Sequence, residues 1–175
     1  MAETLLGENN PSGRLPITFY RDTVGMPAFD DYSMANRTYR YYTGKPLYAF
    51  GHGLSYSTFD YSHVALAPAR LAGEGSTRLT VSVKNSGSRA GDEVVQVYAS
   101  AIRPPVAMPL RQLVGFQRVT LQPGESRKVT IDVSTNQLRR WDDKARRLVV
   151  DRGDYTLTVG PASDKASAST VLTVE

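Results

Sequence analysis

Three pairs of adjacent acidic residues are the side chains of this sequence that could do acid–base chemistry: Asp30/Asp31, Asp92/Glu93 and Asp142/Asp143. A hydrolase that works with two carboxyl groups needs both of them directed at the same bond. Neighbouring residues on an extended strand point to opposite faces, so the two members of such a pair cannot converge. The pairs also lie at expected turns or strand ends, where acids are solvated. We therefore expect no catalytic residue in this chain.

The other reactive side chains are few. The chain has two histidines, His52 and His63, and no cysteine. Without a thiol, a cysteine nucleophile, a thiolate metal site and a disulfide scaffold are excluded. Two isolated histidines lack the spacing of metal ligands. The sequence therefore predicts neither a metal site nor a bound cofactor.

The formal net charge is +4, and the basic residues are scattered except in the run Arg139–Arg147, which surrounds Trp141. A basic cluster with an aromatic residue can hold nucleic acid or an acidic polymer. The alternative, which we favour because no recognised binding motif is present, is a solvated hairpin rim whose tryptophan closes one end of the core. On that interpretation, Trp141→Ala costs about 3–5 kcal/mol of stability.

Alternation of apolar and polar residues dominates from about residue 61 onward. Apolar residues recur at every second position in Val64/Leu66, Leu79/Val81/Val83, Val129/Ile131/Val133 and Tyr155/Leu157/Val159. This period is typical of half-buried strands, and turn residues such as Asn85-Ser86-Gly87 and Pro123-Gly124 separate them. The pattern predicts an all-β fold for residues 61–175, an antiparallel β-sandwich of the immunoglobulin or fibronectin type III kind.

The first sixty residues show a different pattern. One strand is expected at Leu15–Tyr20, and the stretch from Arg21 to Ser57 has no sustained period; together with Tyr20 it holds seven of the ten tyrosines. Because long unstructured loops are uncommon inside compact domains, we expect an aromatic arm that lies along a neighbouring domain. The chain would then start in the middle of something larger. In isolation the arm would be mobile, or exchanged between two copies in a homodimer.

Several stretches resemble the C-terminal part of glycoside hydrolase family 3. The segment Asn10–Phe19, read NPSGRLPITF, resembles the end of that family's α/β second domain, and Pro46–Phe59 resembles its linker. Gly91–Tyr98, Leu113–Phe116 and Pro123–Glu125 are similar to its fibronectin type III-like domain. Two departures are His52, where tyrosine is common, and Val114, where lysine is usual. The stretches follow the family's order and cover nearly the whole chain.

This resemblance implies a fold and an activity. Residues 1–60 would be the tail of the α/β second domain with its linker arm, a short α/β remnant before the sandwich of residues 61–175. Family members cleave terminal β-linked sugars with retention, using an aspartate from an N-terminal barrel domain and commonly a glutamate earlier in the second domain. Neither surrounding motif is present. We therefore predict a non-catalytic C-terminal segment of a β-glucosidase or β-xylosidase that packs against, and stabilises, the barrel and α/β domains.

Five residues are candidates for contact with a β-linked oligosaccharide in the intact enzyme: Tyr39, Tyr41, Tyr42, Tyr48 and His52. Tyrosine suits a partly wet sugar site because it joins an apolar ring to a polar tip, and the glycines beside His52 permit a close loop. The alternative, which we favour, is that these residues fix the linker onto the α/β domain.

A rival function for the sandwich is a module that anchors the enzyme to a carbohydrate or other polymer, which would need exposed aromatic residues on one face. Neither nucleic acid nor a membrane is expected as a partner. A secreted or periplasmic bacterial location is favoured over a cytoplasmic one.

Overall fold

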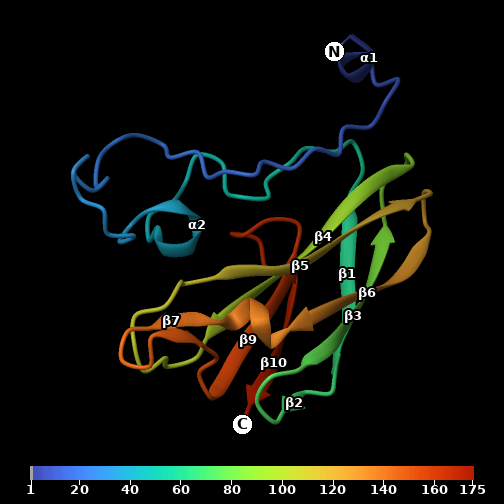
Figure 1. Cartoon of the computed structure of the whole chain (residues 1–175). Helices are drawn as coiled ribbons and strands as arrows, with labels where there is room; N and C mark the ends of the chain where they lie inside the picture. Colours follow the sequence, from blue (N-terminus) through green and yellow to red (C-terminus); the bar gives the residue numbers. More distant parts are fainter. Residues whose placement is uncertain (1) are drawn as a thin grey trace.

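The fold is a β-sandwich that carries an extended N-terminal arm (Figure 1). A computed structural model describes residues 2–175. A three-stranded sheet has the order β1-β3-β6 and a five-stranded sheet the order β2-β10-β9-β4-β5. The strands are β1 (Phe59–Ala67), β2 (Arg70–Leu71), β3 (Ser76–Asn85), β4 (Gly91–Ala101), β5 (Gln112–Leu121), β6 (Ser126–Ser134), β9 (Gly153–Gly160) and β10 (Ala168–Val174). Every pairing except β2 with β10 is antiparallel, so the predicted all-β sandwich is confirmed.

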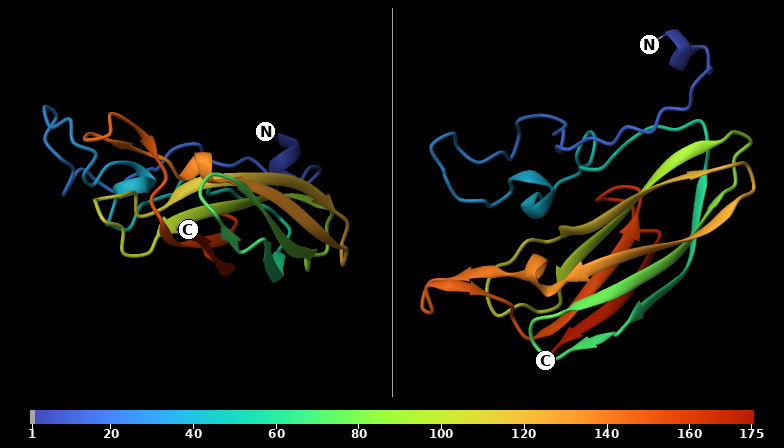
Figure 2. Two further views of the ribbon diagram at one scale, coloured as in Figure 1. Left: turned by 60° about the horizontal axis from the view of Figure 1, so that its bottom comes forward. Right: turned by 45° about the vertical axis from the view of Figure 1, so that its right-hand side comes forward.

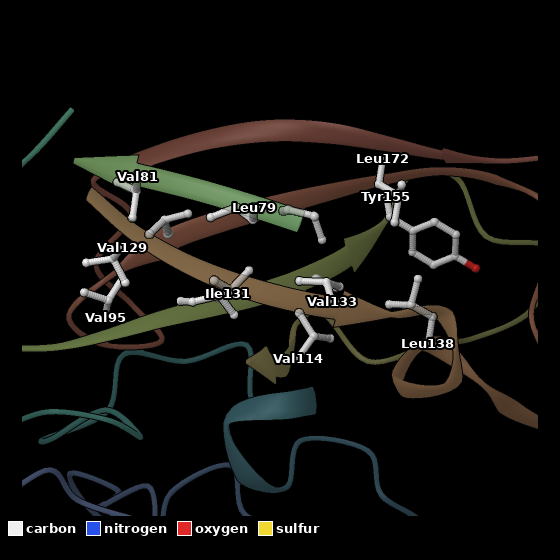
Figure 3. Packing of buried hydrophobic residues seen from close by; sticks show 14 of the residues in the cluster. Leu79, Val81, Val95, Val114, Val129, Ile131, Val133, Leu138, Tyr155 and Leu172 are labelled. Carbon is white, nitrogen blue, oxygen red and sulfur yellow. The ribbon is translucent and has the colours of Figure 1, made fainter. Parts of the chain in front are cut away.

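The core lies between the two sheets (Figure 3). The residues predicted to alternate inward in β3, β6 and β9 are all buried: Leu79, Val81, Val83, Val129, Ile131, Val133, Tyr155, Leu157 and Val159. Val95, Val114 and Leu172 of the five-stranded sheet pack against them. Full burial of a Val or Leu side chain stabilises a fold by about 1.5–3 kcal/mol. This shared core is what makes the sandwich a rigid support for the arm.

The arm comprises residues 2–58 and runs along one end of the sandwich, at the top of Figure 1 and away from the C-terminus. Its helices, α1 (Ala2–Leu5) and α2 (Thr38–Tyr41), have one turn each, and no helix in residues 2–175 is long and apolar enough to cross a membrane. The predicted strand at Leu15–Tyr20 is not a strand of either sheet. This stretch instead pairs with residues 47–52 of the same arm, through bonds such as Phe19 N–H to the Tyr48 carbonyl at 2.9 Å.

The segment after β6 forms the one-turn helix η1 (Thr135–Leu138) and then a hairpin of β7 (Arg140–Asp142) and β8 (Arg147–Val149). Trp141 lies in this hairpin with 56% of its surface exposed, so the prediction that it closes the core is wrong. Leu138 and Tyr155 occupy that end of the core instead (Figure 3). β7 and β8 form a two-stranded sheet of their own, in which Trp141 is paired with Leu148, and neither residue belongs to the core between the two larger sheets.

Strand β1 is the outer strand of the three-stranded sheet and contains a bulge between Ser62 and Ala65. Tyr61 and Val64 both pack against the core although they are three positions apart, which strict alternation forbids. His63, whose φ is +52°, is the extra residue of the bulge. Its insertion turns the side chains of both Tyr61 and Val64 toward the core. The bulge therefore keeps the inward face of β1 apolar on both sides of the irregularity.

Candidate functional site: the junction of the arm and the sandwich

Strand β4 is buried on both of its faces. Val95 and Val97 point into the core, and the alternation directs Gln96 and Tyr98 to the outer face of the five-stranded sheet. Gln96 and Tyr98 are nevertheless only 3% and 2% exposed. The arm covers them, and this covered face of β4 is the centre of the junction.

The polar groups of that face are satisfied by the arm and by one another. The Gln96 side-chain amide donates to the carbonyl oxygens of Gly51, at 3.2 Å, and of Pro161, at 2.5 Å. The Tyr98 hydroxyl donates to Oε1 of Gln96 at 2.6 Å. Burial raises the pKa of Tyr98 well above its usual range, so the phenol stays neutral.

The close approach of the arm depends on Gly51. Its φ is +81°, a region that residues with a Cβ atom rarely adopt. A Cβ placed on Gly51 would lie 2.8 Å from the Tyr98 hydroxyl. Glycine thus serves two needs here, the backbone conformation and the space next to β4.

Tyr39 attaches the middle of the arm to the sandwich loops. Its ring stacks on Phe50 with centroids 4.2 Å apart and meets Tyr98 edge-on at 6.0 Å. Its hydroxyl accepts a hydrogen bond from the Leu113 N–H at 3.1 Å. Nearby, the Leu110 N–H donates to the Arg40 carbonyl at 2.7 Å. An offset or edge-on aromatic pair contributes about 0.5–1.5 kcal/mol beyond its buried area, so Tyr39 is a structural anchor.

A buried ion pair joins the two parts at the other end of β4. An Arg14 Nη atom lies 3.1 Å from a carboxylate oxygen of Glu93, and the two side chains are 11% and 4% exposed. Arg14 also donates to the carbonyls of Ser12 and Gly13 at 3.1 and 3.2 Å. Tyr61 lies next to the pair, and burial together with the Glu93 charge raises the pKa of its phenol far above the usual range.

The side chain of Asn10 joins the start of the arm to residues 55–57 and to Ala90, the residue just before β4. Its side-chain amide donates to the Ser57 hydroxyl at 3.1 Å and to the Ala90 carbonyl at 2.9 Å. Its carbonyl oxygen accepts from the Ser55 hydroxyl at 3.0 Å and from the Tyr56 N–H at 2.8 Å. One asparagine therefore uses donors and acceptor together to hold two other segments, residues 55–57 and the loop at Ala90.

The five sugar-contact candidates do not form one site. Tyr39 and Tyr42 line a hollow of about 610 Å³ together with Lys45 and Arg111. Tyr48 and His52 line a different hollow of about 550 Å³, and their rings lie 5.1 Å apart. Tyr41 lines neither of these two hollows.

The two members of the acidic pair Asp92/Glu93 point apart, as the strand geometry requires. Asp92 binds the Thr120 hydroxyl at 2.6 Å and the Arg118 Nε at 3.0 Å, whereas Glu93 binds Arg14. Hydrogen bonds from Thr120 and Arg118 lower the pKa of Asp92. Within residues 2–175, no three His, Cys, Asp or Glu side chains gather as metal ligands would.

Sequence reasoning missed Asn10, Arg14, Glu93 and Gln96 as functional residues. A signal was present for Glu93, which is in phase with Val95 and Val97 and so had to face the core. A carboxylate on that face needs a buried partner charge. The sequence gives no comparable signal for its partner, because Arg14 lies 79 positions away.

Comparison with known proteins identifies the class and then the family. Residues 93–163 match the fibronectin type III-like domain, and residues 1–56 match the glycosyl hydrolase family 3 C-terminal domain. The chain thus has the architecture of an accessory β-sandwich joined to the end of a hydrolase domain. It belongs to glycoside hydrolase family 3, as part of the C-terminal region of those enzymes.

Two curated relatives illustrate the match. The β-xylosidase of Formosa agariphila is 35% identical over all of this chain and 25% of its own length. The periplasmic β-glucosidase of Salmonella typhimurium is 34% identical over 91% of this chain and 22% of its own length. This chain therefore spans a quarter or less of either relative.

Comparison with solved structures also indicates β-glucosidases of this kind. The β-D-glucoside glucohydrolase of Trichoderma reesei superimposes with a TM-score of 0.88 at 26% identity, over 99% of this chain and 28% of that one. β-Glucosidase 3B of Thermotoga neapolitana superimposes with a TM-score of 0.84 at 32% identity, over 99% and 26%. Because nearly all of this chain is covered in each, the arm as well as the sandwich follows the family's fold.

Proposed function

We propose that this chain is the non-catalytic C-terminal segment of a retaining β-glycosidase that hydrolyses terminal β-D-glucosyl or β-D-xylosyl residues. Its role is to pack against the barrel and α/β domains and to stabilise them. Residues 1–60 are the tail of the α/β domain with the linker arm, and residues 61–175 are the sandwich. The names of the relatives, among them a β-glucosidase and a β-xylosidase, support the substrate class.

The observation that carries this proposal is that the arm has one side bound to the sandwich and an opposite side that is apolar and exposed. One side is bonded to the sandwich through Arg14, Tyr39 and Gly51. The other side leaves large apolar residues exposed: Ile17, Phe19, Leu47, Tyr48 and Leu54. Exposed apolar patches of this kind mark interaction surfaces. In the whole enzyme the rest of the α/β domain covers this side, so the arm is the layer between two domains.

The test uses the purified chain. We expect no turnover of aryl β-glucosides or β-xylosides, and turnover that survives removal of contaminants would contradict the non-catalytic role. We also expect the chain to bind an apolar fluorescent dye at the open side of the arm. The double variant Phe19→Ser/Leu47→Ser should lose this binding, whereas Phe116→Ser, an exposed residue of β5, should keep it. Equal dye binding by both variants would contradict the packing role.

The same open side makes a homodimer of the isolated chain an expected outcome. Two copies that bury their arms against each other would remove this apolar surface from water. Sedimentation at two protein concentrations measures it, and the Phe19→Ser/Leu47→Ser variant should remain monomeric.

One observation favours a second function, the anchoring of the enzyme to a polymer. Trp141 is 56% exposed in a hairpin that projects from the sandwich (Figure 2). An exposed aromatic residue is what the anchoring function requires, and Trp141 has no role in the core that would account for it.

A further inference from the structure

The β7–β8 hairpin and its flanks, residues 139–152, concentrate the charge of the chain. This stretch of the sequence holds six basic and three acidic side chains, a net charge of +3, whereas the whole chain carries +4. Within residues 2–175, no hydrogen bond or ion pair joins the stretch to the arm. The hairpin is therefore a separate surface from the junction described above.

The hairpin presents a small apolar plate. Trp141 and Leu148 lie directly opposite each other in the register, and they are 56% and 55% exposed. The Cβ atoms of such a cross-strand pair lie about 4.5–5.5 Å apart, so the two side chains form one continuous surface. Neither belongs to the core cluster.

The plate is held in position before any ligand arrives. The Trp141 indole N–H donates to a carboxylate oxygen of Asp143 at 3.0 Å. Asp142 accepts from the Ala145 N–H at 2.8 Å, which fixes the turn. At the base of the hairpin, Arg140 makes two bonds to Asp151, at 2.6 and 2.8 Å. A preorganised surface loses less conformational entropy on binding than a flexible one.

The basic residues of the hairpin fall into two groups. Arg139 pairs with Glu74, and Arg140 pairs with Asp142 and Asp151. Lys144, Arg146, Arg147 and Arg152 are exposed, and their side chains have no ion pair or hydrogen bond among the described residues. Lys144 and Arg146 lie in the turn that follows Trp141, whereas Arg147 begins β8 and points to the opposite face of the hairpin from Leu148. The charge of all three side chains is available to an anionic ligand.

We propose that this hairpin binds an acidic polysaccharide, a chain of sugars that carries carboxylate substituents. The Trp141–Leu148 plate packs against the apolar face of a pyranose ring, and Lys144 and Arg146 in the adjoining turn bind the carboxylates. Arg147, on the opposite face of the hairpin, adds its positive charge to the attraction. The proposal rests on the anchoring function above and names its ligand. A neutral polymer would leave the three cations without partners. A single aromatic plate also lacks the successive stacking positions that single-stranded nucleic acid uses.

Native gel electrophoresis of the 175-residue chain tests the proposal, with 4-O-methylglucuronoxylan in the gel and neutral arabinoxylan in a parallel gel. We expect retardation by the acidic polymer only. Trp141→Ala should weaken binding by about tenfold, since stacking on an aromatic side chain has an effect of that order. The triple variant Lys144→Gln/Arg146→Gln/Arg147→Gln should weaken it by a similar factor. Phe116→Ala, which removes an exposed aromatic residue elsewhere on the sandwich, should bind normally.

Two further measurements are the salt dependence of binding and a comparison with single-stranded DNA. Raising NaCl from about 0.1 to about 1 M shortens the Debye length from about 10 to about 3 Å, so it should reduce binding of the unchanged chain more than that of the triple variant. No retardation, equal retardation by the neutral polymer, equal loss in Phe116→Ala and Trp141→Ala, or tighter binding to single-stranded DNA would each overturn the proposal. None of these outcomes affects the packing role, which is tested by dye binding and activity.

Discussion

The guanidinium of Arg14 and the carboxylate of Glu93 lie 3.1 Å apart and are almost completely buried, although 79 positions separate them in the sequence. The pair crosses the junction between the arm and β4. Two charges are costly to bury unless each has its partner. Docking of the arm therefore supplies the partner that the buried Glu93 carboxylate needs, and it stabilises the sandwich.

Removal of one member of this pair should be strongly destabilising. Arg14→Met leaves the Glu93 charge buried without a partner, and a loss of about 3–5 kcal/mol is expected. Arg78→Met is the matched control, because Arg78 and Asp132 form an ion pair on the surface, where such pairs contribute at most about 1 kcal/mol. Urea denaturation at neutral pH measures both. Equal losses in the two variants would show that burial of the pair is unimportant.

Substitution of Gly51 should detach the arm without unfolding the sandwich. Gly51→Ala introduces both a strained backbone and a contact with Tyr98. Gly73→Ala is the control, since Gly73 also has a positive φ, +78°, but an added Cβ would meet nothing within 4 Å. Hydrogen exchange at the Leu15 and Phe19 amides, which bond within the arm, should accelerate in Gly51→Ala only. Acceleration in both variants would assign the effect to backbone strain.

Trp141→Ala should leave the stability of the chain nearly unchanged. The side chain is exposed, and surface substitutions change the free energy of unfolding by about 0.5 kcal/mol or less. Leu138→Ala, in contrast, should cost about 2–5 kcal/mol because Leu138 is buried in the core. Thermal melting of the two variants distinguishes these cases. A large drop in melting temperature for Trp141→Ala would restore a core role for the tryptophan.

Asp92 should contribute to stability against acid. Hydrogen bonds from Thr120 and Arg118 lower the pKa of its carboxyl in the folded chain, while the unfolded value is about 3.9. The contribution is therefore complete above about pH 4 and is lost as the pH falls through the folded pKa. Asp92→Asn should be less stable than the unchanged chain at pH 7, and the difference should disappear in strong acid. Asp132→Asn, on the exposed face of β6, is the control and should follow the unchanged chain at every pH.

Alkali should reveal three buried phenols. Burial raises the pKa values of Tyr61, Tyr98 and Tyr155, whereas tyrosine in the unfolded chain ionises near pH 10. The neutral phenols therefore stabilise the fold below that pH, and this contribution is lost as the pH rises above it.

The ultraviolet absorbance of tyrosinate measures this effect directly. Three of the ten tyrosines should ionise only when the fold is lost. Tyr98→Phe should reduce the delayed part of the titration. A single titration step near pH 10 for all ten would contradict the burial of these phenols.

The sandwich could be predicted from the sequence because the alternation of apolar and polar residues that defines each strand lies within that strand's own residues. Alternation identifies the inward residues of β3, β6 and β9 without knowledge of their partners. The hairpin could not be oriented in this way, since Trp141 and Leu148 have the composition of a core pair. Their exposure follows from the position of the hairpin, which forms a sheet separate from the two that enclose the core.

The junction was harder to predict because its contacts are distant in sequence. The alternation of β4 assigns Gln96 and Tyr98 to an outer face, and nothing local indicates that Gly51 covers it. The expected strand at Leu15–Tyr20 was wrong for a related reason. Its polar backbone groups are satisfied by residues 47–52 of the arm rather than by a sheet, and that pairing is not encoded in the period of the segment itself.

The bulge at His63 bears on how the molecule behaves in crowded solution. An outer strand that is long and straight offers a row of free backbone groups to which the outer strand of another copy can add. In β1 that row is interrupted between Ser62 and Ala65, and β2, at the edge of the other sheet, is only two residues long. β1 and β2 are therefore poor templates for end-to-end growth into fibres, so one edge of each sheet is protected against the addition of a strand from another copy.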